Sequence, residues 1–229
     1  MNAIATVIAA NIAAAFVIYC GIKLFDIGSD FADFIRRYGV FLGIVIAFIT
    51  IFNFLLVDTA DLVDDGLLYW TVFVSMICFA VLGRIIEASK RIILERKKKK
   101  KKQISASSLL ILIVIELAIG VAYGLASGMS FMVTTGTGVM VLCSVILLRL
   151  MSEVSTIGRF QEARLSRGQN ILITAISLCA MPISAILVYL FCHPNFRSMG
   201  VYMASATGFL VYVCLLQITT LVVKKYKNR

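Results

Sequence analysis

The sequence is short of the residues on which most enzyme and metal sites depend. Among 229 residues there is one histidine, His193, and only 15% of the residues are charged. The chain contains no HExxH, GxSxG or Walker A motif. Zinc proteolysis, serine hydrolysis and ATP-driven transport by this chain alone therefore have no support in the sequence. We expect no enzymatic activity, no cofactor and no metal site.

Cysteine and basic charge are present, but neither forms a recognisable binding pattern. Five of the six cysteines lie inside apolar runs and Cys192 lies at the edge of one, without CxxC spacing. Buried cysteine commonly acts as a small apolar residue. The net charge of +10 is spread over the short connections between apolar runs. Membrane orientation explains this distribution better than phosphate binding does, so we expect no nucleic-acid partner.

Hydrophobic residues, in contrast, make up 61% of the chain, above the roughly 45–50% of soluble domains. They gather into seven runs, and a helix of about 20 apolar residues crosses the hydrocarbon core of a bilayer. The sequence therefore predicts an all-α, polytopic transmembrane helix bundle that forms one domain over residues 1–229, with the cell membrane as its location. The runs are Ile4–Leu24, Tyr38–Val57, Leu67–Gly83, Ser107–Ser127, Phe131–Leu150, Ile171–Phe191 and Val201–Val223. The shortest link, Gly128–Ser130, predicts a tight antiparallel hairpin.

The distribution of lysine and arginine predicts the orientation. Almost all of them follow the first, third, fifth and seventh runs, whereas the other connections hold one basic residue, Arg197. Because basic residues favour the cytoplasmic side, the N-terminus is predicted outside and the C-terminus inside.

Residues 84–106 form the longest hydrophilic connection and are predicted to be a basic cytoplasmic loop into which the third span continues as a helix. One interpretation of its lysine run is docking to anionic lipids of the cytoplasmic leaflet, at about 1 kcal/mol per basic residue near the surface. Docking to an acidic partner is a second interpretation, and a topology signal with no later role is the third. The run consists of Lys97, Lys98, Lys99, Lys100, Lys101 and Lys102.

Glu116 is the only carboxylate near the middle of an apolar run. Ionisable residues at membrane depth are costly and often functional, so Glu116 is a candidate for a solute or ion path and should face the protein interior. A protonated glutamic acid bonded to a neighbouring helix is the structural alternative. The other path candidates are Asn11, Asn53, Thr134 and Thr135. The four-residue spacing of Arg149 and Glu153 predicts a structural ion pair.

Gly120, Gly124 and Gly128 repeat every four residues in the fourth run. Such a series forms a groove that another helix backbone can approach closely, in the same chain or in a second copy. Two functions remain open. One is a transporter or channel-like membrane subunit that moves a small solute or ion. The other is a non-catalytic anchor or assembly subunit, with a second copy or other membrane subunits as partners.

Overall fold

The computed structural model of the chain describes residues 3–27, 30–100, 106–162, 165–191 and 196–227. All the secondary-structure elements of the described residues are helices, and these residues contain no strand. Seven helices are long and apolar enough to cross a membrane, which confirms the predicted all-α seven-span bundle. The elements are α1 (Ala3–Ile27), α2 (Asp30–Thr50), the π-helical turn η1 (Ile51–Leu55), α3 (Leu56–Ala60), α4 (Asp65–Lys100), α5 (Ala106–Val133), α6 (Thr135–Glu162), α7 (Arg167–Phe191) and α8 (Phe196–Lys227).

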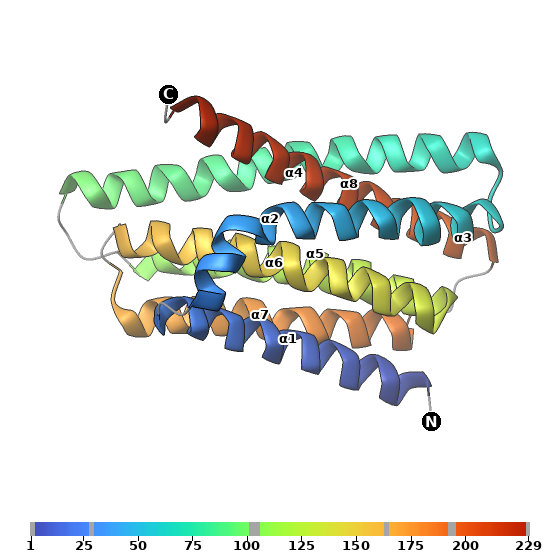
Figure 1. Cartoon of the computed structure of the whole chain (residues 1–229), viewed down its shortest axis with the longest axis horizontal. Coiled ribbons are helices and arrows are strands. Elements are labelled where there is room, and N and C mark those ends of the chain that lie inside the picture. The colour runs from blue at the N-terminus through green and yellow to red at the C-terminus, as the bar shows by residue number, and fades with distance from the viewer. Residues whose placement is uncertain (1–2, 28–29, 101–105, 163–164, 192–195, 228–229) are drawn as a thin grey trace.

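The helices lie side by side along the long axis of the molecule, and the two chain ends lie at opposite ends of the bundle (Figure 1). An odd number of spans requires this arrangement. The second span, Tyr38–Ala60, is assembled from α2, η1 and α3 without a break. Which end of the bundle faces the cytoplasm stays a prediction from the basic residues.

The two most extensive helix pairings are α5 with α7 and α4 with α8. Helix α1 packs on α6 and α7, and α2 packs on α6. The main hydrophobic core draws buried residues from α1, α2, η1, α5, α6, α7 and α8, including Ile18, Leu55, Val145, Met181 and Leu210, whereas α4 adds the partly buried Phe79. Helix α4 is the most peripheral span, because only 6% of its apolar stretch is buried, against 61% for α6.

The predicted turn at Gly128–Ser130 is wrong, because α5 continues through it to Val133. Ser130 Oγ donates to the carbonyl of Ala126 at 2.7 Å, and the backbone there keeps its helical hydrogen bonds. The turn lies at Thr134, whose Oγ1 accepts the backbone N–H of Thr137 at 3.0 Å and so caps α6. The antiparallel hairpin is retained with a later turn.

Most of residues 84–106 is helix rather than loop, since α4 extends to Lys100 and α5 begins at Ala106. The predicted helical continuation of the third span is therefore confirmed. Residues 101–105, and with them Lys101 and Lys102, lie outside the described residues. The side chains of Lys97, Lys98, Lys99 and Lys100 are likewise outside the description, although their backbone belongs to α4.

Candidate functional site: a buried charge cluster beside a cavity

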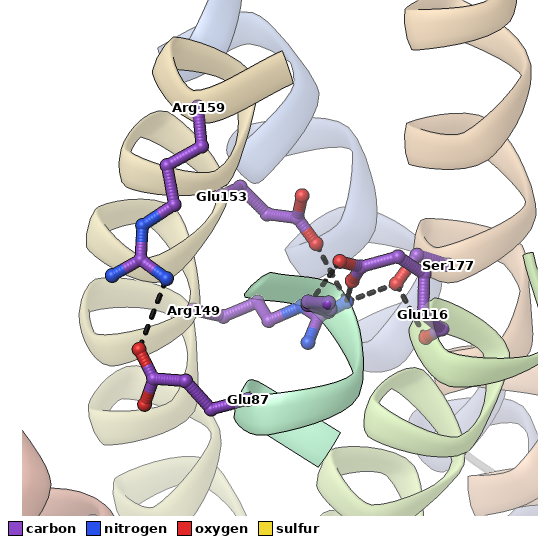
Figure 2. Close-up of polar contacts among 7 residues, drawn as sticks. Glu87, Glu116, Arg149, Glu153, Arg159 and Ser177 are labelled. Atoms are coloured by element: carbon purple, nitrogen blue, oxygen red, sulfur yellow. Dashed lines mark hydrogen bonds and ion pairs between the residues drawn. The ribbon is translucent and has the colours of Figure 1, made fainter. Parts of the chain in front are cut away.

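Four ionisable side chains from three helices meet inside the bundle, and we call them the charge cluster. They are Lys90 of α4, Glu116 of α5, and Arg149 and Glu153 of α6. Their side chains are 11%, 3%, 1% and 3% exposed, respectively. Figure 2 shows Arg149 reaching from α6 toward Glu116 and Ser177 on the facing helices. Two positive and two negative groups leave the cluster formally neutral.

Glu116 is held by two cations. Lys90 Nζ donates a hydrogen bond to its Oε1 atom, and Nη2 of Arg149 lies 4.0 Å from its Oε2 atom. The same Nη2 atom lies 2.6 Å from Oε1 of Glu153, four residues away on α6. This confirms the ion pair that the spacing of Arg149 and Glu153 predicts. The contact is ionic in character, because Oε1 of Glu153 accepts no hydrogen bond of good geometry from the described residues.

Ser177 of α7 connects the cluster to the helix backbone. Its Oγ atom accepts a hydrogen bond from Nη2 of Arg149 and donates one to the carbonyl of Glu116 at 2.8 Å. The guanidinium of Arg149 also lies over the ring of Tyr123, with 5.0 Å between Cζ and the ring centroid. Such cation–π contacts are strongest where water is excluded. Arg149 is therefore fixed from α5, α6 and α7 at once.

Charges at this depth are stable only as a set. Removing a charge from water costs several kcal/mol, and mutual attraction offsets that cost only where partners and hydrogen bonds are complete. Lys90, Glu116 and Arg149 each have an opposite charge within 4.0 Å. Loss of one partner would leave another charge buried without compensation. The cluster thus ties α4, α5 and α6 together at one depth.

A cavity of about 470 Å³ lies against the cluster, between α4, α5, α6 and α8. Lys90 and Tyr123 both line the cavity, and they also contact Glu116 and Arg149, respectively. The charged groups of its lining come from α4 and α6, where Glu87 and Arg159 form a half-exposed ion pair at 2.9 Å. The walls from α5 and α8 are mainly apolar and include Ala122 and Phe209.

The predicted path residues are not gathered at one place. Glu116 faces the protein interior, 2% exposed, as predicted. Asn11 is also buried, but its Oδ1 atom accepts a hydrogen bond from Ser127 of α5 at 2.9 Å, which is an interhelical packing contact. Asn53 is exposed on η1. Thr134 and Thr135 are exposed at the α5–α6 turn, where Thr134 caps α6.

The glycine series on α5 packs as predicted, and the structure identifies its partner as α7 of the same chain. A Cβ atom at any of the three positions would overlap a carbonyl oxygen of α7. The facing pairs are Gly120 with Ser177, Gly124 with Met181, and Gly128 with Ala185. The same close approach allows Ser177 to reach the carbonyl of Glu116.

The sequence predicts that Lys90 lies in the connection of residues 84–106, and it indicates no role for Ser177 or Tyr123. The structure adds that the Lys90 side chain is buried against α5, whereas the side of the membrane on which this segment lies stays a prediction. A signal was available, because Lys90 shares a helical face with Ile86, Ile93 and Leu94, and a face of that kind packs inward. Ser177 and Tyr123 carry no comparable signal, since both depend on how helices distant in sequence meet.

Comparison with protein-family models, with curated proteins and with solved structures finds no match. Among the described residues, no group of three or more His, Cys, Asp or Glu side chains lies close enough to hold a metal ion. The functional argument therefore depends on the charge cluster and the cavity.

Proposed function

We propose that this integral membrane protein is a transporter or channel-like subunit that moves a small solute or ion, and that the cavity is its solute site. The observation that most supports this proposal is the position of Lys90, which lies in the cavity wall and forms an ion pair with the buried Glu116. Intramembrane ionisable residues typically mark substrate or ion pathways. A cavity of about 470 Å³ is also within the range of small-ligand sites.

An assembly or anchor role is the second candidate, and two observations favour it. The four charges of the cluster compensate one another, as a purely structural network would. Helix α4 also presents a broad exposed face that includes Phe73, Ile77 and Val81, which another membrane subunit could cover.

Light scattering by proteoliposomes tests the transporter proposal. Vesicles holding the purified full-length protein are transferred into isosmotic glycerol, glycine, sodium lactate or potassium chloride, with valinomycin added for the last salt. Solute entry appears as swelling. We expect at least one of these solutes to enter faster than into protein-free vesicles.

The matched variant is Ala122→Phe, which places a ring in the cavity, and its control is Ala175→Phe on the exposed surface of α7. The first change should abolish the faster entry and the second should leave it intact. Swelling equal to that of protein-free vesicles for every solute argues against transport of small water-soluble solutes. Purification in mild detergent with another chain at fixed stoichiometry would then support the assembly role.

A further inference from the structure

Building on the proposed function, we infer that the cavity binds a single-chain amphiphile with an anionic headgroup, such as a fatty acid or an alkyl phosphate, taken from the surrounding lipid. The inference rests on the proposed function, in which this cavity is the ligand site, and it names the class of ligand. It depends on three features of the cavity: an apolar half, a polar half in which two cations keep N–H donors beyond their ion pairs, and an opening toward lipid.

The apolar half suits an acyl chain. It is formed mainly by small and aromatic side chains of α5 and α8, among them Ala118, Ala122, Ala126, Phe209 and Val213. The alanines leave space because their side chains end at Cβ, and Phe209 closes the space from α8. An acyl chain that moves from the bilayer into this half replaces its contacts with lipid by contacts with these side chains, so no apolar surface of the chain becomes exposed to water.

The polar half is a stripe inside a membrane span. Ser152, Ser155, Thr156 and Arg159 all line the cavity from α6, at the spacing that places side chains on one helical face. They lie within the span Thr135–Phe160. Because these polar groups line a cavity and do not pack against apolar side chains, their position indicates a polar ligand group or water at that end.

The two cations of this half keep N–H donors beyond those used in their ion pairs. Arg159 has five N–H donors and gives one to Glu87, while Lys90 has three and gives one to Glu116, counted among the described residues. A carboxylate or phosphate headgroup suits the remaining donors, because charged acceptors form the strongest hydrogen bonds with guanidinium and ammonium groups. A cationic headgroup would offer these donors no acceptor.

The cavity reaches the side of the bundle between α4 and α5. Leu82 of α4 and Ala118 of α5 both line it, and both are exposed on the membrane-crossing surface. These two helices make few direct contacts along their lengths. A ligand can therefore pass between the cavity and the acyl-chain region without crossing the core of the bundle.

Fluorescence quenching in nanodiscs of zwitterionic phosphatidylcholine tests the inference. The only tryptophan, Trp70, is replaced by phenylalanine, and a reporter is introduced by Leu125→Trp in the cavity wall. A second protein carries Leu187→Trp on the exposed surface of α7 and reports partition into lipid alone. The quencher is 12-bromododecanoate, and each protein is first checked for unchanged helix content by circular dichroism.

We expect saturable quenching of the cavity reporter and a non-saturating response of the surface reporter. Dodecyl phosphate should displace the quencher about tenfold better than dodecyltrimethylammonium, with dodecanol between them. Inorganic phosphate should displace none, because the chain supplies much of the binding. Arg159→Gln should weaken binding of dodecyl phosphate, and Arg167→Gln, a control on α7 that does not line the cavity, should not.

Identical, non-saturating quenching of the two reporters would overturn the inference, as would better displacement by the cationic amphiphile or by inorganic phosphate. Binding is measured here without any flux, so the two proposals fail separately. Saturable anionic binding without entry of glycerol, glycine, lactate or potassium chloride contradicts transport of small water-soluble solutes and keeps the amphiphile site. Solute movement without amphiphile binding contradicts only the substrate class.

Discussion

Helix α5 meets two of its neighbours, α7 and α4, in opposite ways. Against α7 it presents Gly120, Gly124 and Gly128, and the two backbones approach so closely that a Cβ atom would overlap a carbonyl oxygen. Against α4 it presents Glu116, and the contact is made by the tip of the Lys90 side chain. The first interface is closed, whereas the second borders a cavity of about 470 Å³.

The difference lies in what holds each interface. Small residues let two helices gain dispersion contacts along their whole length. Helix α4 is held to α8 in a similar manner, with Gly208 of α8 against the backbone of Val72. Toward α5 and α6 it has two ion pairs, together with a small apolar cluster in which Ile93 and Leu94 pack near Leu112. Ion pairs can exchange partners with a ligand or water, so we expect this interface to be the adaptable one.

Filling the closed interface should have the largest effect. Gly124→Leu forces a branched side chain against the carbonyl of Met181 and the hydroxyl of Ser184, so α5 and α7 must separate. Overpacking costs about 1–3 kcal/mol in soluble cores, and a backbone clash belongs at the upper end or beyond. Thermal unfolding in detergent, followed by circular dichroism, should show strong destabilisation or loss of folded protein.

Gly158→Leu on α6 is the matched control, since a Cβ atom at Gly158 has no neighbour within 4 Å. Its unfolding temperature should stay close to that of the unchanged protein. Equal stability of the two leucine variants would mean that the α5–α7 interface is not close-packed in the membrane.

Breaking the charge cluster should have the second largest effect. Glu116→Leu leaves Lys90 without its hydrogen-bonded acceptor and leaves Arg149 with one carboxylate in place of two. Removing one partner of a buried pair costs about 3 kcal/mol or more in soluble proteins. Unfolding by a denaturing detergent at fixed lipid content measures the loss.

The double variant Lys90→Met/Glu116→Leu completes a thermodynamic cycle. If the two groups interact as the structure shows, the double change should cost less than the sum of the single changes. Additive costs would contradict a direct Lys90–Glu116 pair.

The Glu87–Arg159 pair should matter much less for stability. Its side chains are 45% and 49% exposed, so solvent or headgroups screen their attraction. Glu87→Gln should lower the free energy of unfolding by less than about 1 kcal/mol, as for other exposed pairs. Its effect should appear instead in the cavity, where Arg159 gains a free donor and dodecyl phosphate should bind more tightly in the nanodisc assay. Weaker binding would show that Glu87 helps to hold the ligand.

The sequence predicts the seven spans because each span depends only on the length of its own apolar run. The four-residue period of the glycines predicts which face of α5 packs closely. The sequence also predicts that Glu116 is buried, from its position near the middle of a run, and that Arg149 pairs with Glu153, from their helical spacing. The partner helix of the glycines and the cation opposite Glu116 could not be predicted, because both depend on tertiary arrangement. Lys90 in particular lies 26 residues from Glu116 in the chain.

The predicted path residues do not come together for a related reason. The sequence indicates Asn53, Thr134 and Thr135 by residue type and position in a span, but every helix has an exposed side, and each of these residues lies on that side or at a turn. Ser152, Ser155 and Thr156 give no signal of their own in the sequence, because serine and threonine are common near helix ends. That they share one face of α6 becomes informative only when the structure shows that this face lines the cavity.

The smallest effect on stability is expected from the lysine run, which extends the adaptable helix α4 beyond its ion pairs. Changing all six lysines, 97–102, to glutamine removes no contact described for the core, so the free energy of unfolding should be unchanged. If the run docks on anionic lipid, each lysine contributes up to about 1 kcal/mol near the surface. The attraction should weaken with salt, because the Debye length falls from about 10 Å at 0.1 M to about 3 Å at 1 M.

Hydrogen exchange of residues 84–100 in nanodiscs measures whether docking of the lysine run on lipid holds α4. In discs with phosphatidylserine at low salt, the glutamine variant should exchange faster than the unchanged protein, and at high salt the two should agree. Arg84, Lys90, Arg91 and Arg96 remain in the variant, so insertion is kept. Identical exchange at low salt would mean that the run is a topology signal only, and that α4 is held by α8 and the charge cluster alone.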